Sequence, residues 1–246
     1  MDRLIYTALS GLSASMDRQR VIASNMANAQ TIGFRAELMD QRAITIAGDQ
    51  PEVRAQQQAL VRGADMQGGE AVMTSRPLDI AMDGTALLAV QAEDGSEAYT
   101  RRGDLSVRAD GLLVNGEGSP VVGEAGPITV PLTGVVSITP SGAVTVSDPG
   151  TPDLPPLEVA QIKLASPDGT QISKSVDGLF RVVGGGILPT DDAATVKPGY
   201  LEQSNVKTTE VLVEMIDQQR LFAMRTKLVT TAKDIDESGA QLMRLG

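Results

Sequence analysis

The two ends of this chain share a pattern that its middle lacks. Residues 3–29 and 201–245 contain no proline, and apolar residues recur in them every three or four positions. This spacing places the apolar side chains along one face of an α-helix. The segment between them is rich in proline and glycine and carries short alternating apolar runs. We therefore predict an α+β fold, with long N- and C-terminal helices packed together in a coiled-coil-like manner and a central all-β antiparallel domain.

The N-terminal helix is predicted within residues 1–34, where Asp2 can cap its start. Its apolar positions follow one another at alternating steps of four and three, which is the heptad spacing of coiled coils. A polar residue inside such a seam fixes the register of packing at some cost in stability. The predicted seam consists of Ile5, Leu9, Leu12, Met16, Gln19, Ala23 and Met26.

The C-terminal helix is predicted within residues 199–246, and Ser204 or Asn205 can cap its start. The two helices can pair inside one molecule, or they can pack against other subunits. Because a single helix pair buries only one stripe on each helix, the wide C-terminal stripe favours contacts with other subunits. The predicted seam consists of Leu212, Met215, Gln219, Phe222, Thr226 and Val229, and it is widened by Ile216, Ala223 and Thr230.

The central segment, residues 76–198, is predicted to be an antiparallel β domain. Twelve of the thirteen prolines in the chain lie between residues 77 and 200, so turn signals recur at short intervals. Asp-Gly or Ser-Gly pairs at 83–84, 110–111 and 141–142 separate alternating apolar runs, which is typical of β-hairpins.

A third segment, residues 35–75, precedes the predicted β domain and differs from it in composition. It is polar and rich in glutamine, with three glutamines in a row at 56–58. Such a composition is typical of an extended arm or a linker.

The residue composition excludes most familiar active sites. The chain has no histidine and no cysteine, which removes the commonest general base, thiolate metal ligands and the Ser/His and Cys/His nucleophile pairs. The formal net charge of -10 opposes binding to nucleic acid. We predict no catalytic, cofactor-binding or metal-binding residues, no cofactor, and a protein that is not an enzyme.

One remote alternative is a periplasmic hydrolase that uses paired carboxylates. Asp79 and Asp83 lie four positions apart, as do Asp104 and Arg108. Such pairs arise by chance in an acidic protein, and an aromatic content of 2% without tryptophan offers a poor platform for sugar rings.

The start of the chain carries no targeting pattern. Leu4, Ile5 and Tyr6 are followed at once by polar residues, whereas a secretory signal has an apolar stretch of roughly 7 to 15 residues. No apolar run approaches the roughly 18 residues that span a bilayer. We expect neither a cleaved signal peptide nor a transmembrane segment.

One short motif links the chain to a known family. The motif Asn25-x-x-Asn28, followed by Thr31-x-Gly33-Phe34, resembles the N-terminal signature of bacterial flagellar rod and hook proteins. Asparagine tolerates a left-handed backbone, so Asn25 and Asn28 are expected to close the helix. Gly33 would allow the turn, and Phe34 would anchor the chain on the next domain. From the chemistry alone, the same residues can equally be a helix stop and a loop.

Further blocks extend this resemblance over nearly the whole chain. The opening residues 1–8 and the block 199–206 are similar to the proximal-rod type within the family. Residues 85–88 depart from the family, which often has aromatic residues there. The remaining matching blocks are residues 75–81, 98–101 and 215–217.

The resemblance implies a structural subunit of the bacterial flagellum, a motility organelle. Similar proteins are exported through the flagellar type III apparatus and assemble helically, with copies of themselves and other rod proteins, into a hollow drive shaft across the periplasm. That shaft, the rod of the basal body, transmits torque and conducts exported subunits. A distal-rod or hook subunit of the same family remains the alternative.

Overall fold

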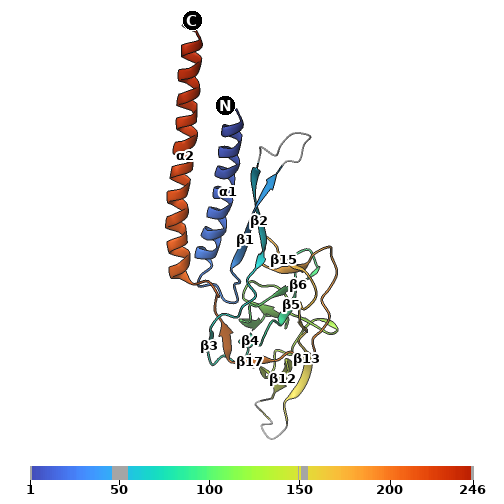
Figure 1. Cartoon of the computed structure of the whole chain (residues 1–246). Coiled ribbons are helices and arrows are strands. Elements are labelled where there is room, and N and C mark those ends of the chain that lie inside the picture. Colours follow the sequence, from blue (N-terminus) through green and yellow to red (C-terminus); the bar gives the residue numbers. More distant parts are fainter. Residues whose placement is uncertain (1, 46–54, 149, 151–154, 245–246) are drawn as a thin grey trace. The chain divides into compact units, whose positions relative to one another are not determined.

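The computed structural model describes residues 2–45, 55–148, 150 and 155–244 (Figure 1). Within these ranges, the side chains of residues 2–8, 40–45, 55–62, 236, 237 and 239–244 are not described. The chain divides into two compact units. The first, which we call the helical unit, comprises Met1–Ala27, Glu37–Arg62 and Lys207–Gly246, and the second, the β unit, comprises Asn28–Ala36 and Gly63–Val206.

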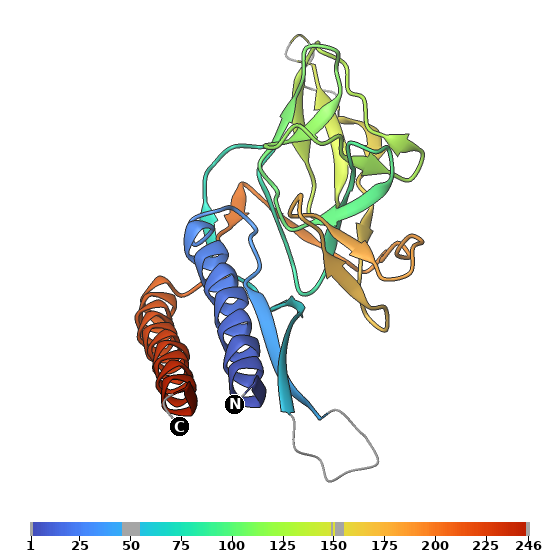
Figure 2. The ribbon, with the colours of Figure 1, turned by 90° about the horizontal axis from the view of Figure 1, so that it is seen from above.

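In the residues that the structure describes, the helical unit consists of two long helices and two strands. Helix α1 (Asp2–Ala27) and helix α2 (Thr208–Arg244) lie side by side and run in opposite directions (Figure 1). Strands β1 (Glu37–Thr45) and β2 (Ala55–Ala64) pair as a two-stranded sheet, which lies beside α1 (Figure 2). The predicted arm, residues 35–75, is therefore divided between the two units.

Both helices are shorter than the segments predicted for them. Helix α1 has 26 residues and α2 has 37. The chain leaves α1 in a turn in which the Thr31 N–H donates to the carbonyl of Asn28 at 3.1 Å. Residues 200–202, which fall inside the predicted C-terminal helical segment, form a strand instead.

The β unit contains the remaining strands, and every strand pair described in it is antiparallel. Its largest sheet has the order β14-β5-β6-β16-β15. These strands span Leu164–Ala165, Leu87–Gln91, Glu97–Thr100, Phe180–Val182 and Ile172–Lys174, in that order. A three-stranded sheet is built from β11 (Val135–Ile138), β12 (Ala143–Ser147) and β13 (Leu157–Gln161).

Four further strand pairs complete the β unit. Two of them join the first strands of this unit to its last strands, so the entry and the exit of the chain lie close together. The pairs are β3 (Ala71–Met73) with β18 (Tyr200–Glu202), β4 (Ile80–Met82) with β17 (Val196–Pro198), β7 (Leu105–Val107) with β8 (Leu113–Asn115), and β9 (Val122–Gly123) with β10 (Gly126–Pro127).

Two of the three predicted hairpin turns are confirmed. β7 pairs with β8 across 110–111, and β11 pairs with β12 across 141–142. The hairpin predicted at 83–84 is wrong, because β4 pairs with the distant strand β17 instead of β5. Gly84 does adopt the left-handed backbone of a turn, with φ of 57°, but the turn directs the chain into a different sheet.

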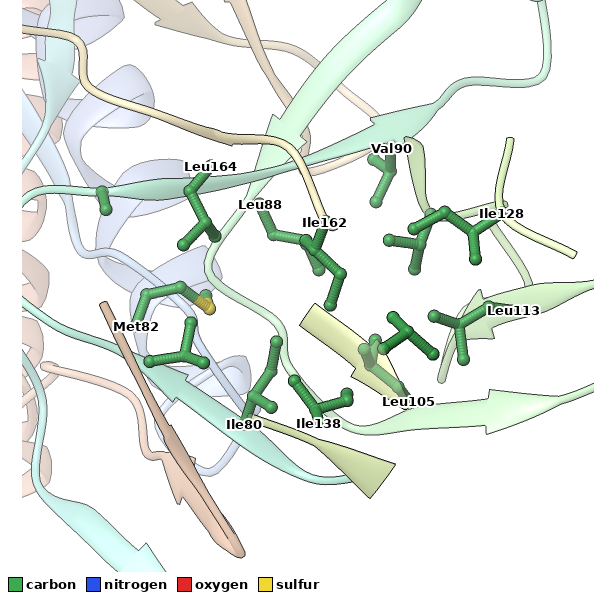
Figure 3. Packing of buried hydrophobic residues seen from close by; sticks show 14 of the residues in the cluster. Ile80, Met82, Leu88, Val90, Leu105, Leu113, Ile128, Ile138, Ile162 and Leu164 are labelled. Atoms are coloured by element: carbon green, nitrogen blue, oxygen red, sulfur yellow. The ribbon is translucent and has the colours of Figure 1, made fainter. Parts of the chain in front are cut away.

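The core of the β unit is made of aliphatic side chains from many short strands (Figure 3). Leu88 and Val90 point into this large cluster, whereas Leu87 and Ala89 belong to a second cluster around Tyr99. Because alternate side chains of a strand point to opposite faces, β5 is buried on both faces. Labelled members of the large cluster in Figure 3 are Ile80, Met82, Leu88, Val90, Leu105, Leu113, Ile128, Ile138, Ile162 and Leu164.

Neither helix, over the residues that the structure describes, combines the length and apolar character needed to cross a bilayer.

Candidate subunit interface

The face that α1 turns inward within the helical unit is lined by small or aliphatic residues. The buried side chains are Ala14, Ser15, Val21, Ile22 and Asn25. The guanidinium of Arg225 on α2 reaches this face and donates to the carbonyl of Gly11 and to the hydroxyl of Ser15. Small residues at these positions leave room for the arginine side chain to approach the α1 backbone.

A second polar contact fixes how the two helices meet. Arg18 on α1 forms an ion pair of 2.6 Å with Glu214, near the start of α2. Together with the Arg225 contacts, this pair sets the antiparallel direction and the rotation of α2. Partly buried side chains of α2 therefore recur at Val211, Met215, Gln218, Phe222, Arg225 and Val229.

The predicted α1 seam lies largely on the other side of that helix. Leu9 is 54% exposed and Met16 is 57% exposed, and Ala23 is exposed as well. Leu12, Gln19 and Met26 are partly buried. The side chain of Ile5 lies outside the described residues. The two helices thus pair within one chain, yet Leu9 and Met16, on the face of α1 that the heptad spacing predicts, remain mostly exposed.

The predicted α2 seam is split between two faces. Met215, Phe222 and Val229 are partly buried, whereas Leu212, Gln219 and Thr226 are exposed. The partly buried positions 211, 218 and 225 each precede an exposed predicted position by one residue. Successive residues of an α-helix are rotated by about 100° about its axis. The Arg18 and Arg225 contacts therefore turn α2 so that positions 211, 218 and 225 face α1 in place of the predicted 212, 219 and 226.

Asn25 joins α1 to strand β1 inside the helical unit. Its amide group donates to the carbonyl of Glu37 at 3.1 Å, and its side-chain oxygen accepts from the Glu37 N–H at 2.8 Å. The residue lies within the last turn of α1 and is buried. The expectation that Asn25 closes the helix is therefore replaced by a different role, in which it acts as a partner for the strand backbone.

The rest of the signature lies in the β unit and forms a tight loop. The Thr31 hydroxyl donates to the Asn28 side-chain oxygen at 3.1 Å, directly after α1 ends. Gly33 has φ of 67°, and a Cβ there would come within 2.4 Å of the Arg101 backbone. Only glycine fits at this position, because both the conformation and the space exclude a side chain.

Phe34 contacts a cation through its ring and the segment after the last strand, β18, through its carbonyl. The ammonium of Lys174 lies 3.4 Å from the centre of the Phe34 ring, a cation–π arrangement. The Phe34 carbonyl accepts from the N–H of Asn205 at 3.3 Å. Phe34 therefore packs within the β unit, and its carbonyl binds the segment through which the chain leaves this unit.

A buried cluster of charges lies next to this loop. The carboxylate of Glu202 pairs with Arg35 at 2.7 Å and with Arg101 at 2.6 Å, and it also accepts from the N–H of Gly69 at 2.7 Å. All three charged side chains are buried. Burial lowers the pKa of the Arg101 guanidinium, which nevertheless stays charged because its ordinary pKa is so high.

Arg101 also satisfies the carbonyl groups of a neighbouring turn. Its guanidinium donates to the carbonyls of Met82, Gly84 and Ala86. Arg35, Arg101 and Glu202 therefore connect the entry of the chain into the β unit, the turn after β4 and the last strand β18.

Asn205 holds three passages of the chain together and does not cap α2. Its side-chain oxygen accepts from the Ala36 N–H at 2.7 Å, and its amide group donates to the carbonyls of Asp65 and Gln67 at 2.9 and 3.0 Å. Helix α2 begins three residues later, at Thr208. The prediction of Asn205 as the helix cap is wrong, because backbone groups of two other segments, at Ala36 and at 65–67, form hydrogen bonds with its side chain.

Three family models match separate parts of the chain. A model described as flagella basal body rod protein matches residues 5–35, which include α1 and the signature loop. A model of the flagellar hook protein FlgE/F/G D1 domain matches residues 81–146, and a model of the flagellar basal body rod FlgEFG protein C-terminal region matches residues 197–242.

Whole-chain comparison gives the decisive similarity. The chain is 39% identical to the flagellar basal-body rod protein FlgF of Salmonella typhimurium over 251 residues, with 100% of both chains covered. The chain belongs to the FlgF family of flagellar basal-body rod proteins. FlgF of Escherichia coli is 38% identical, again with 100% of both chains covered. FlgG of Caulobacter vibrioides, a related rod protein, is 30% identical over 97% of this chain and 98% of its own length.

Sequence reasoning missed the buried charges that join the ends of the β unit in this FlgF-family chain. Glu202 and Arg101 fall inside blocks that resemble the family, and Arg35 follows Phe34 directly. Nothing in their spacing separates them from solvent-exposed charges, since Glu and Arg are rarely buried. Their position inside the matching blocks was the only available signal.

The aspartates considered for hydrolysis do not form an accessible pair. Asp79 is fully buried. Asp83 pairs with Lys197 at 2.6 Å and accepts from the Thr195 hydroxyl, and the Lys197 contact lowers its pKa. Asp104 is held by Arg102 at 2.8 Å. Each of these carboxylates thus has a structural environment of its own.

Proposed function

We propose that this chain is a structural subunit of the proximal part of the flagellar basal-body rod. There it would assemble helically with copies of itself and other rod proteins into the hollow drive shaft that transmits torque and conducts exported subunits. The observation that carries this proposal is the uncovered apolar face of α1, seen at Leu9 and Met16. A helix normally buries its apolar stripe against another element, so this face is suited to a neighbouring subunit.

The proposed interface consists of the two helix seams, packed in a coiled-coil-like manner between subunits. On α1 it comprises Ile5, Leu9, Leu12, Met16, Gln19 and Met26, and on α2 it comprises Leu212, Met215, Gln219, Phe222 and Val229. The segments 1–34 and 199–246 would thus act as the axial part of the subunit. The signature residues Asn25, Asn28, Thr31, Gly33 and Phe34 would set how the chain passes from that part into the β unit.

Membership of the family supports a proposal for the route to this location. The subunit would pass through the flagellar type III export apparatus without a cleaved signal peptide and then reside in the rod where it crosses the periplasm. Export through a narrow channel requires no enzymatic activity of the cargo, and the proposed role is mechanical.

Exchanging exposed seam residues for charged ones tests the proposal. Leu9→Glu and Met16→Glu, expressed in a strain that lacks its own copy of the gene, should abolish swimming and leave the variant out of purified basal bodies. The matched controls Leu9→Met and Met16→Leu should swim normally. Because both side chains are exposed, circular dichroism of the purified variants should match the unsubstituted protein. Normal swimming of the glutamate variants would overturn the proposal.

A distal-rod or hook subunit is the competing position within the axial structure. The higher identity to FlgF than to FlgG supports the proximal rod. A photoreactive residue in place of Leu9 or Phe222 would identify the axial neighbours by crosslinking. Crosslinks confined to hook or distal-rod subunits would move the chain to that position.

A further inference from the structure

Helix α2 carries a second exposed stripe, apart from the predicted seam. Val213, Met224 and Ile235 are 59%, 58% and 56% exposed, and each is eleven positions from the next. Eleven residues complete about three turns of an α-helix, so these side chains lie in one line. We call this line the outer stripe.

The two edges of the outer stripe carry opposite charges. Successive residues of a helix are rotated by about 100°, which places Glu210 and Asp217 along one edge and Arg220 and Lys227 along the other. All four side chains are exposed. The acidic pair and the basic pair each span seven positions, so their charges are spaced alike.

Most of these four charged side chains form no ion pair in the part of the chain that the structure describes. In the part of the chain that the structure describes, Asp217, Arg220 and Lys227 have no ion-pair partner, and Glu210 pairs with Lys207, where both side chains are mostly exposed. A groove of about 590 Å³ opens along the acidic edge, and its lining includes Glu210, Val213 and Asp217. The groove offers space beside two carboxylates for a basic side chain from outside.

We propose that the outer stripe binds the outer stripe of a second copy of this chain, parallel to it and displaced along the helix by ten to eleven residues. This inference rests on the proposed function, because it names one contact within the shaft. The displacement is about 16 Å at about 1.5 Å per residue. It sets Glu210 and Asp217 of one copy against Arg220 and Lys227 of the other, and Val213 and Met224 against Met224 and Ile235.

The direction follows from the distribution of charge between the two edges. When two helices face each other in parallel, the left edge of one meets the right edge of the other, as the e and g positions do in a parallel coiled coil. An acidic edge then meets a basic edge. In an antiparallel pair the same edges meet, which would place the acids against acids and the bases against bases.

The displacement makes the contact asymmetric. One copy uses Val213 and Met224 of its outer stripe, and its neighbour uses Met224 and Ile235. Because α2 has 37 residues, two copies displaced by ten to eleven residues overlap over most of the helix. The contact therefore joins two copies that are offset along the helix axis.

Disulfide trapping tests the contact, because the chain has no cysteine of its own. Purified full-length Asp217→Cys and Lys227→Cys variants, mixed and oxidised gently, should form a mixed disulfide dimer about tenfold faster than either variant alone, as expected when the contact raises the local concentration. A chain with both substitutions should form a disulfide-linked dimer. The control pair is Glu93→Cys with Asp168→Cys, exposed positions of the β unit that should show no preference.

Charge exchange provides an independent readout. Asp217→Lys and Lys227→Asp alone should each slow formation of the linked dimer by about two- to fivefold, which is the range of a single exposed ion pair. The double exchange should restore the rate. For this measurement, crosslinking uses cysteines at Val213 and Met224.

The outcomes separate this inference from the proposed function. Equal rates for stripe and control pairs, or faster linking of Asp217→Cys to itself, would overturn the parallel self-contact. If the unsubstituted protein still restored swimming and appeared in basal bodies, the proposed function would stand. Absence of the protein from basal bodies would remove both.

Discussion

The β unit and the helical unit differ in how they pack their large apolar residues. In the β unit, Leu88 and Leu105 are completely buried inside a closed cluster, although other apolar residues, such as Leu157, are exposed at its surface. In the helical unit, Met16 and Leu228 are mostly exposed although their helices already pack on each other. The β unit thus completes a core within one chain, whereas the described residues of the two helices bury few large apolar side chains. This difference distinguishes a part with a core of its own from a part whose apolar surface is available to partners.

Charged residues show the same contrast. The β unit buries Arg35, Arg101 and Glu202 and neutralises much of their charge internally. Among its described residues, the helical unit has a partly exposed interhelical ion pair between Arg18 and Glu214 and a series of exposed charges along α2. Buried charges require fixed partners, while exposed charges remain available for partners outside the chain.

The largest expected effect comes from removing the shared partner in the β unit. Glu202→Gln should lower the free energy of unfolding by about 3–5 kcal/mol, because Arg35 and Arg101 would stay buried without a counter-charge. Urea denaturation measures this loss, and hydrogen exchange of the β5 and β6 amides in the folded protein measures it independently. Glu214→Gln in the helical unit is the matched control and should cost no more than about 1 kcal/mol. Equal losses would mean that the two units do not differ in how they hold charge.

A pair of identical substitutions tests the contrast in apolar packing. Leu88→Ala should destabilise the β unit by about 2–5 kcal/mol, because it opens a cavity in a closed core. Leu228→Ala on α2 should change the stability of the free chain by no more than about 0.5 kcal/mol, because that side chain is exposed. Thermal and urea unfolding of both variants provide the comparison. A large loss from Leu228→Ala would show that the helical unit already buries this side chain in solution.

Tyr99 forms two hydrogen bonds inside the β unit, and they test how closely this unit is packed. Its hydroxyl donates to Glu97 and accepts from the Leu188 N–H, both at 2.6 Å. Tyr99→Phe should cost about 1–3 kcal/mol, because the Leu188 N–H loses its buried acceptor. Urea unfolding measures the loss, and Tyr200→Phe, at a less buried tyrosine, serves as the control.

The same tyrosine predicts a change of stability with pH. Burial raises the pKa of Tyr99 above its ordinary value, so the neutral form is favoured in the folded chain. Its contribution to stability should be complete below pH of about 10, the ordinary pKa of tyrosine, and should decline at higher pH. Ultraviolet titration should show Tyr99 ionising last. Ionisation of all three tyrosines at a common pH would contradict the buried hydrogen bonds.

The smallest expected effect concerns a surface pair of the β unit. The Lys197 contact lowers the pKa of Asp83, so this pair stabilises the folded chain above the ordinary aspartate pKa of about 3.9 and loses its effect as the pH falls. Asp83→Asn should therefore lose less stability than Tyr99→Phe at neutral pH and should match the unsubstituted chain in acid. Lys197→Gln should behave in the same way, and an additive loss in the double variant would show that the two side chains act separately.

Local patterns in the sequence were reliable where neighbouring residues decide the structure. The hairpins at 110–111 and 141–142 and the existence of both terminal helices follow from turn residues and periodicity. The hairpin at 83–84 failed because a strand more than a hundred residues away pairs with β4. On α2, the heptad spacing found an apolar stripe, but the spacing alone was compatible with several rotations of the helix.

The roles of single polar residues depended even more on distant parts of the chain. Asparagine is a residue type that often caps helices, and Asn205 lies shortly before α2. Its side chain nevertheless forms hydrogen bonds with the backbone of Ala36, Asp65 and Gln67. Asn25 likewise pairs with the Glu37 backbone instead of ending its helix. Both residues form these bonds because the fold brings backbone groups of other segments within reach.

By itself, the sequence determined that the chain has helical ends and a β-rich middle, that the usual catalytic side chains are missing, and that its motifs are those of a flagellar rod family. These properties depend on composition and on spacings of a few residues, which local backbone geometry converts directly into structure. Only the tertiary structure decided which helix face is covered, which charges are buried and where each strand finds its partner. Those outcomes require contacts between residues far apart in the chain, and such contacts form only when the whole chain competes for the same space and the same hydrogen bonds.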